Sequence, residues 1–240
     1  MSDETSKFPI TLALELSQQA GSVAMCGSGG MILEKVVDSG RRELDDVMPS
    51  IEAIARELHI SPKEIDCVIV SIGPGGFTGL RSAVAIAKMI ALVSGAALIP
   101  VETAMSVVAN AGCEAGTYFV VSGVKQDSFW LSTVRVNGGS ITCSAAPSNT
   151  KDLSLVLEEA SVLFGDSFIP QSVVTKAKCE NAVIRETSTS AKTLLELGLR
   201  LYTGNKIQAI DPLKLLPLYP REPEAVRVWN KNHEQAKTDN

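Results

Sequence analysis

The sequence predicts an α/β fold made of two similar lobes. Short apolar segments alternate with longer segments of helical periodicity, and their order is the same in both halves of the chain. That order is three strands, then helix, strand, helix and strand. With 45% of its 240 residues hydrophobic, the chain can bury the core of one large domain or two small ones.

Strands dominate the beginning of the chain. Each predicted strand is an apolar segment bounded by turn residues, and the glycines within 27–30 form the turn between the second and third strands. The predicted strands of the first half are 8–16, 22–26, 31–37, 67–71 and 97–101.

A first helix is predicted at 44–58, because its apolar residues recur at i, i+4, i+7 and i+11. Pro49 then lies near the first turn, where a missing N–H is tolerated. The residues that share this apolar face are Val47, Ile51, Ile54 and Leu58.

A second helix is predicted at 78–93, with Thr78 as its N-cap. It is apolar nearly all round, and its two cations, Arg81 and Lys88, project from the same edge. We expect its own sheet to cover one side of this helix and something else to cover another.

The second half is a looser copy of the first. Strands are predicted at 118–122, 129–136 and 140–144, with Asn137-Gly138-Gly139 as the turn between the last two. The remaining predicted elements are a helix near 151–160, a strand at 161–164 and a helix near 188–202.

These elements predict a first lobe at 1–106, a second lobe at 107–210 and a tail at 211–240. Four prolines between 212 and 223 exclude a long helix, so we expect the tail to run extended over the lobes and to fray at its end. The order of elements is that of the two-lobed actin, hexokinase and Hsp70 (ASKHA) architecture, in which each lobe is ribonuclease H-like.

Composition excludes several classes of protein. A net charge of -5 with scattered basic residues argues against a protein that grips nucleic acid alone. Five widely spaced cysteines without a C-x-x-C pair disfavour both a disulfide framework and a zinc site. The N-terminus has no basic and then apolar signal, so we expect the chain in the cytoplasm.

The most informative motif is the turn Gly-Pro-Gly-Gly-Phe-Thr-Gly-Leu-Arg at 73–81, between a strand and a helix. It is not a P-loop, because Leu80 and Arg81 follow the closing glycine where a lysine and a hydroxyl are needed. The dinucleotide fingerprint G-x-G-x-x-G also fails. Three roles stay open for the turn: phosphate binding, a partner surface, and close packing only.

The sequence shows no recognisable set of catalytic residues. Its two histidines, His59 and His233, have no partner at metal-ligand spacing, and no Ser, His and acid trio is credible. Glu15 and Ser17 occupy the region where a nucleotide-binding acid and hydroxyl are usual in this architecture, but the second lobe has Ser122 where another acid is expected. We therefore predict no catalytic residue, no metal site and only a degenerate nucleotide site at Glu15 and Ser17.

Four segments resemble the bacterial TsaB (YeaZ) family of tRNA threonylcarbamoyladenosine biosynthesis proteins, which is glycoprotease-like. They are 11–17, 73–81, 85–88 and 218–221. The turn carries the strongest match, through Gly73, Pro74, Gly75, Phe77, Thr78, Gly79 and Arg81.

This resemblance implies a non-catalytic subunit that pairs with the related catalytic protein TsaD, together with the ATPase TsaE. The complex uses ATP and Mg²⁺ to modify the adenosine beside the anticodon of tRNAs that read ANN codons. Alone, the chain is expected to form a homodimer, and tRNA is contacted mainly through the complex. The expected partner interface consists of Val47, Ile51, Ile54, Leu58, Leu80, Val84, Ile86 and Ala87.

The alternative is a working small-molecule kinase or ATPase of the ASKHA type. Glu15, Ser17 and the two lobes motivate it. It requires binding of Mg-ATP by this chain, whereas the resemblance implies no cofactor of its own. Peptidase activity is not expected.

Overall fold

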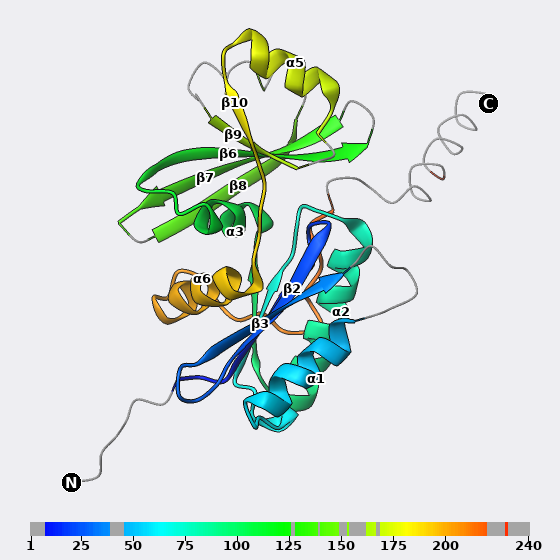
Figure 1. Ribbon diagram of the computed structural model, residues 1–240, viewed down its shortest axis with the longest axis vertical. Helices are drawn as coiled ribbons and strands as arrows, with labels where there is room; N and C mark the ends of the chain where they lie inside the picture. The colour runs from blue at the N-terminus through cyan, green and yellow to red at the C-terminus, as the bar shows by residue number, and fades with distance from the viewer. Residues whose placement is uncertain are drawn as a thin grey trace, which may run out of the picture.

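The computed structural model describes residues 8–38, 46–125, 128–138, 140–148, 153, 162–166, 169–219 and 229. It contains two five-stranded sheets, one in each half of the chain (Figure 1). The likeness of these two sheets confirms the predicted α/β fold with duplicated lobes.

The first sheet has the strand order β3-β2-β1-β4-β5. β1, β2 and β3 form an antiparallel meander, whereas β4 and β5 run parallel to β1. Both faces of this sheet are apolar, as is typical of a sheet that is covered by helices on both sides. The bounds are β1 Thr11–Glu15, β2 Ala20–Cys26, β3 Ile32–Asp38, β4 Cys67–Ser71 and β5 Ala97–Val101.

The second sheet repeats this topology, since its order is β8-β7-β6-β9-β10 when it is counted from β8. β6, β7 and β8 form the meander, and β9 and β10 are parallel to β6. The bounds are β6 Gly116–Lys125, β7 Ser128–Asn137, β8 Ser140–Ser148, β9 Val162–Gly165 and β10 Val183–Glu186.

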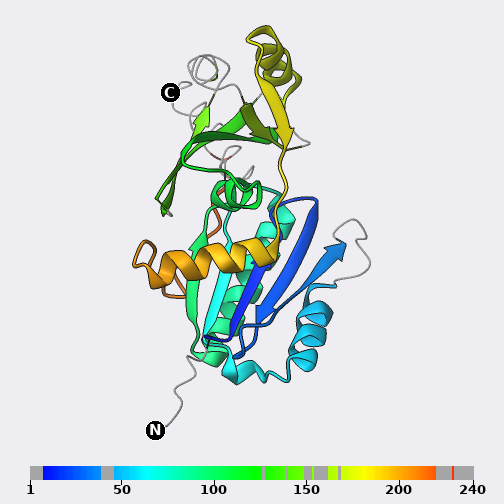
Figure 2. The ribbon, with the colours of Figure 1, turned by 60° about the vertical axis from the view of Figure 1, so that its left-hand side comes forward.

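Helices lie outside both sheets and between them (Figures 1 and 2). α1 and α2 pack on the outer face of the first sheet, and α5 lies outside the second. Between the sheets, α3 contacts strands of the second sheet and α6 those of the first. The bounds are α1 Val47–Glu57, η1 Pro62–Glu64, α2 Phe77–Ser94, α3 Thr103–Asn110, α5 Gln171–Cys179 and α6 Ala191–Thr203.

The last helix of each half thus packs on the sheet of the other half. α6 falls within the expected second lobe, 107–210, by sequence, but it covers the first sheet by contact. α3 crosses the expected boundary at residue 106. This exchange fills the space between the sheets with one shared core, to which α3, α6 and both inner sheet faces contribute.

Several local predictions differ from the structure. Gly76, not Thr78, is the N-cap of α2, because Gly76 is the last residue with an extended backbone before the helix. α3, α5 and β10 were not predicted: α3 is a short helix buried on most sides, and β10 is a short, largely exposed edge strand. The predicted helix near 151–160 lies outside the described residues except for Leu153, which is helical.

Residues 210–219, here named the C-terminal segment, return to the first sheet. Ile210 forms an antiparallel bridge with Leu98 on β5. Further along, Leu215 is buried in the core beneath α2, and the backbone N–H of Leu218 donates to the carbonyl of Ile72 at 2.7 Å. This segment therefore runs beside α2 as part of the first lobe.

Candidate interaction surface and inter-lobe site

The glycine turn packs against the loop that follows β1. A Cβ at Gly75 would overlap the backbone oxygen of Ser17, and one at Gly79 would overlap that of Leu16. The N–H of Gly76 donates to the same Ser17 oxygen at 2.7 Å. These glycines therefore permit the close approach of α2 to the loop, and one N–H of the turn is already bonded to the chain's own backbone.

Gly73 has a different reason to be glycine. Its φ of +108° lies in a region that disfavours other residues, and a Cβ there would be 2.8 Å from the backbone oxygen of Leu218. The peptide bond between Gly73 and Pro74 is cis. The start of the motif is therefore shaped by contact with the C-terminal segment.

Three motif and tail side chains form a cluster at the beginning of α2. The rings of Phe77 and Tyr219 lie 5.1 Å apart, and the Arg81 guanidinium carbon is 5.2 Å from the Phe77 ring centroid. Phe77 and Arg81 are exposed, whereas Tyr219 is half-buried. We name these three residues the aromatic cluster.

The residues predicted as a partner interface lie mostly in the chain's own core. Leu58 and Ile86 are half-buried, and the others are buried, all but Leu80 in the core of the first lobe. A partner on these helices would meet their opposite side, so the predicted set describes how the helices bind their own sheet. The buried members are Val47, Ile51, Ile54, Leu80, Val84 and Ala87.

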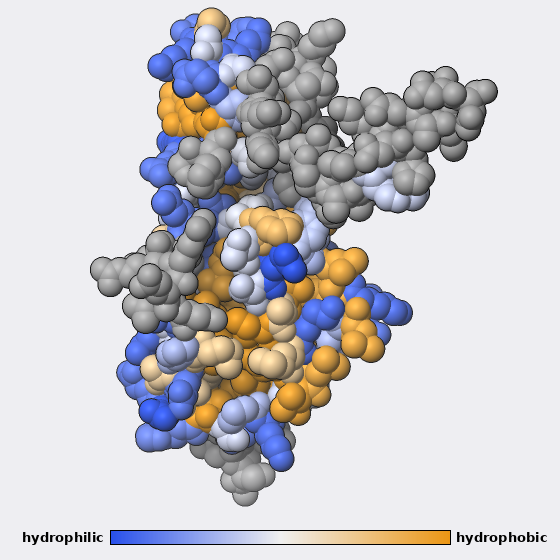
Figure 3. Space-filling model, turned by 90° about the vertical axis from the view of Figure 1, so that its right-hand side faces the viewer, coloured by the Kyte–Doolittle hydropathy of each residue, from blue (hydrophilic) through white to orange (hydrophobic). Residues whose placement is uncertain are grey.

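The outward side of α2 is also apolar. Met89, Leu92 and Val93 are 51%, 56% and 68% exposed, and Ala85 is exposed beside them. We name these four residues the α2 face. Apolar residues gather on this side of the first lobe (Figure 3), and Met48 on α1 adds a further exposed one.

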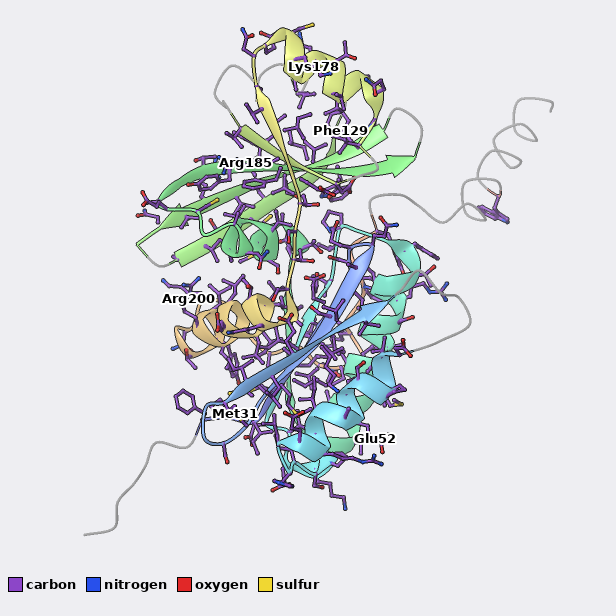
Figure 4. All side chains as sticks on the ribbon, in the orientation of Figure 1. Met31, Glu52, Phe129, Lys178, Arg185 and Arg200 are labelled. Carbon is purple, nitrogen blue, oxygen red and sulfur yellow. The ribbon has the colours of Figure 1, made fainter. Side chains whose placement is uncertain are left out.

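Charges flank this surface unevenly. Residues 67–101 contain no Asp or Glu, so the charged groups of α2 are Arg81 and Lys88 alone. α1 carries an exposed ion pair between Arg56 and Glu52, the latter labelled in Figure 4. α2 is long and apolar enough to cross a membrane. Core helices of soluble proteins also meet this criterion of length and hydropathy, so it is weak evidence.

The predicted nucleotide residues belong to a buried polar cluster between the sheets. Glu15 is completely buried, and its Oε1 accepts hydrogen bonds from the backbone N–H and the hydroxyl of Ser17. Ser71 and Thr103 share a hydrogen bond of 2.8 Å nearby. In the part of the chain that the structure describes, Glu15 Oε2 and Ser106 Oγ are buried and have no partner at hydrogen-bond geometry, although Ser71 and Ser106 lie near enough to lower the pKa of Glu15. Burial raises the pKa of Glu15, and hydrogen bonds from Ser17 only partly offset this.

The second lobe has an acid at the end of β9, the strand that corresponds to β4 and not to β1. Asp166 follows β9, and both of its carboxylate oxygens accept from the N–H of Gly123, at 3.1 and 3.0 Å. Within the described residues, no group of three His, Cys, Asp or Glu side chains could hold a metal ion. Glu15 is closed off from solvent with its Oε1 bonded to Ser17, and the glycine turn packs on the chain's own loop.

One shallow cleft of about 270 Å³ opens between α3 and β10. Its polar groups include Asn110, Arg185 and Ser188, of which Arg185 is labelled in Figure 4. The Asn110 amide already donates to Ser188 and accepts from Thr193, so it is occupied by the chain itself.

Comparison with known proteins agrees with this fold. Residues 32–158, more than half of the 240, match the family model described as TsaD, tRNA N6-adenosine threonylcarbamoyltransferase. The tRNA threonylcarbamoyladenosine biosynthesis protein TsaB of Bacillus subtilis (strain 168) is 25% identical over 80 residues, 33% of this chain. That match spans 35% of the relative's own length.

Two solved structures from Pseudomonas aeruginosa share the whole fold. One is described as a protein with similarity to peptidase YeaZ, with a TM-score of 0.71, 19% identity, and coverage of 89% of this chain and 100% of that one. The other is YeaZ, with a TM-score of 0.69, 18% identity, and coverage of 88% and 100%. At these identities the likeness concerns the arrangement of both sheets and their helices.

Proposed function

Because the chain belongs to the TsaD family, and within it to the TsaB (YeaZ) proteins, we propose that it is a non-catalytic subunit of the complex that makes N6-threonylcarbamoyladenosine in tRNA. The modified adenosine lies beside the anticodon of tRNAs that read ANN codons. In this proposal the chain pairs with the catalytic protein TsaD, and the ATPase TsaE joins them. With a net charge of -5, it contacts tRNA mainly through the complex.

The exposed apolar side chains of the α2 face are the main support for pairing with a partner. Its three large side chains expose more than half of their surface, although buried apolar residues already hold the other side of α2 on the sheet. Burying the exposed parts in an interface would contribute on the order of 3 kcal/mol, from about 1.5–3 kcal/mol per fully buried side chain. A second copy would cover the same face when the partner is absent, which supports a homodimer of the isolated chain.

The chemistry of the buried groups supports a role without catalysis. Glu15 is closed off from solvent, and its Oε1 is bonded to the chain's own Ser17 rather than presented to a ligand. His59 is an exposed residue that follows the C-cap of α1, with a φ of 54°. Among the described residues, neither Glu15 nor His59 belongs to a group of three His, Cys, Asp or Glu side chains that could hold a metal ion.

Reconstitution tests this proposal. TsaD, TsaE, tRNA, ATP and the threonylcarbamoyl donor should yield modified tRNA only when this chain is added, and this chain with tRNA alone should yield none. Equal product in its absence would contradict the proposal. Product made by this chain alone would contradict the non-catalytic role.

The alternative, an ASKHA-type kinase or ATPase, rests on Glu15 and Ser17 lying at the carboxyl end of the first sheet. Titration calorimetry of the purified chain with millimolar Mg-ATP separates the two proposals. A saturable heat that is lost in Glu15→Ala would favour the enzyme. We expect no such heat.

A further inference from the structure

We propose that the C-terminal segment, residues 210–219, is itself part of the partner-docking surface, and that the partner presents an apolar protein face with a carboxylate opposite Arg81. This inference rests on the proposed function, because it extends the α2 face to a second element. It assigns a binding role to residues that follow both lobes in the sequence.

The segment is held firmly along α2. The N–H of Ile210 donates to Leu98 at 2.8 Å, and the Lys88 ammonium donates to the carbonyl of Leu215 at 3.2 Å. Near the first turn of α2, Leu218 donates to Ile72 at 2.7 Å. These contacts run from the edge of β5 to the start of the helix, so the segment is a fixed border of the α2 face.

The segment buries one leucine and exposes two. Leu215 is 1% exposed, whereas Leu213 and Leu216 are each 72% exposed. Anchoring to the first lobe requires only the buried leucine, and polar side chains would serve at the other two positions. Leu213 and Leu216 flank Leu215, whose carbonyl is bonded to Lys88 of α2, so exposed apolar side chains lie on two neighbouring elements of the first lobe.

The aromatic cluster places a cation at the end of this surface. Phe77 is contacted by Tyr219 from the segment and by Arg81 from α2, so the segment helps to orient the motif's exposed groups. Within the described residues Arg81 makes no ion pair. Since residues 67–101 contain no acid, charge complementarity calls for a carboxylate on the partner.

The central test measures affinity for purified TsaD by titration calorimetry with the full-length chain. Leu213→Glu combined with Leu216→Glu should raise Kd about tenfold or more, because two leucines would no longer be buried apolar contacts. Val183→Glu is the matched control, since it places glutamate at a 57% exposed valine on β10 of the second sheet and should leave Kd unchanged. If the glutamates lower the melting temperature, Leu213→Ser with Leu216→Ser replaces them.

Met89→Glu separates this inference from the proposed function. If Met89→Glu weakens binding and the leucine pair does not, the segment has no docking role, although the proposed subunit function stands. If none of the variants changes Kd, neither the segment nor the α2 face docks the partner and the inference is wrong, whereas the subunit function is decided separately by the reconstitution. If the leucine variants alter only self-association in sedimentation, the segment serves a second copy and the inference is wrong.

Arg81 tests the chemistry of the partner. Arg81→Glu should weaken binding more than Arg81→Ala, because it sets two carboxylates against each other. The difference between these variants should shrink as salt is raised. Equal Kd values for both variants at low salt would contradict a carboxylate opposite Arg81.

Discussion

Glutamate substitutions on the two sides of α2 should separate folding from docking. Val84 is 5% exposed and packs in the core beneath α2, whereas Met89 is 51% exposed on the α2 face. Val84→Glu loses about 2 kcal/mol of apolar burial and must also bury an unpaired carboxylate, which costs several kcal/mol more. We expect a loss of at least about 4 kcal/mol, a large part of the 5–15 kcal/mol typical of a domain.

Met89→Glu should behave in the opposite way. Only about half of the Met89 side chain leaves an apolar environment, so its unfolding free energy should fall by about 1 kcal/mol or less. Docking would bury the new carboxylate, and a penalty of about 3 kcal/mol would raise Kd for TsaD about a hundredfold. Both variants have the same new side chain on the same helix, so they control for each other.

Urea unfolding and titration calorimetry check both halves of this prediction. If Val84→Glu unfolded like the wild type, Val84 would not be a core residue and the expected loss of stability would be wrong. The docking prediction fails if Met89→Glu binds TsaD with unchanged affinity while folded. That result would place the docking surface elsewhere.

Three further predictions concern stability. Because burial raises the pKa of Glu15 above 4.5, its favourable contribution is complete below about pH 4.5 and is lost as pH rises through the folded-state pKa. Glu15→Gln should therefore gain melting temperature relative to the wild type as pH rises, and parallel pH profiles would contradict this. Gly79→Ala should lose about 1–3 kcal/mol in urea unfolding because its Cβ meets the Leu16 oxygen, whereas Gly29→Ala, with open space around it, should change little. Leu215→Ala should lose about 2–5 kcal/mol, and a smaller loss in urea unfolding would mean that the C-terminal segment is not anchored in the core.

Local pattern was enough for much of the secondary structure. β4 and β5 have the predicted bounds, and α2 begins one residue before the predicted start, because their apolar segments are flanked by clear turn residues. α3 was missed because it is only eight residues long and is buried on most sides, so it has no amphipathic pattern. β10 was missed because its side chains are largely exposed.

The sequence by itself determined the duplicated lobes, the absence of P-loop chemistry at 73–81 and the resemblance carried by that turn. It could not decide which side of α2 faces the sheet, because both Val84 and Met89 are apolar and periodicity reports only shared faces. The exchange of α3 and α6 between sheets, and the return of Leu215 to the first core, also depended on the tertiary structure. Such placements result from contacts between distant parts of the chain, and these alone separate the buried side of α2 from its exposed side.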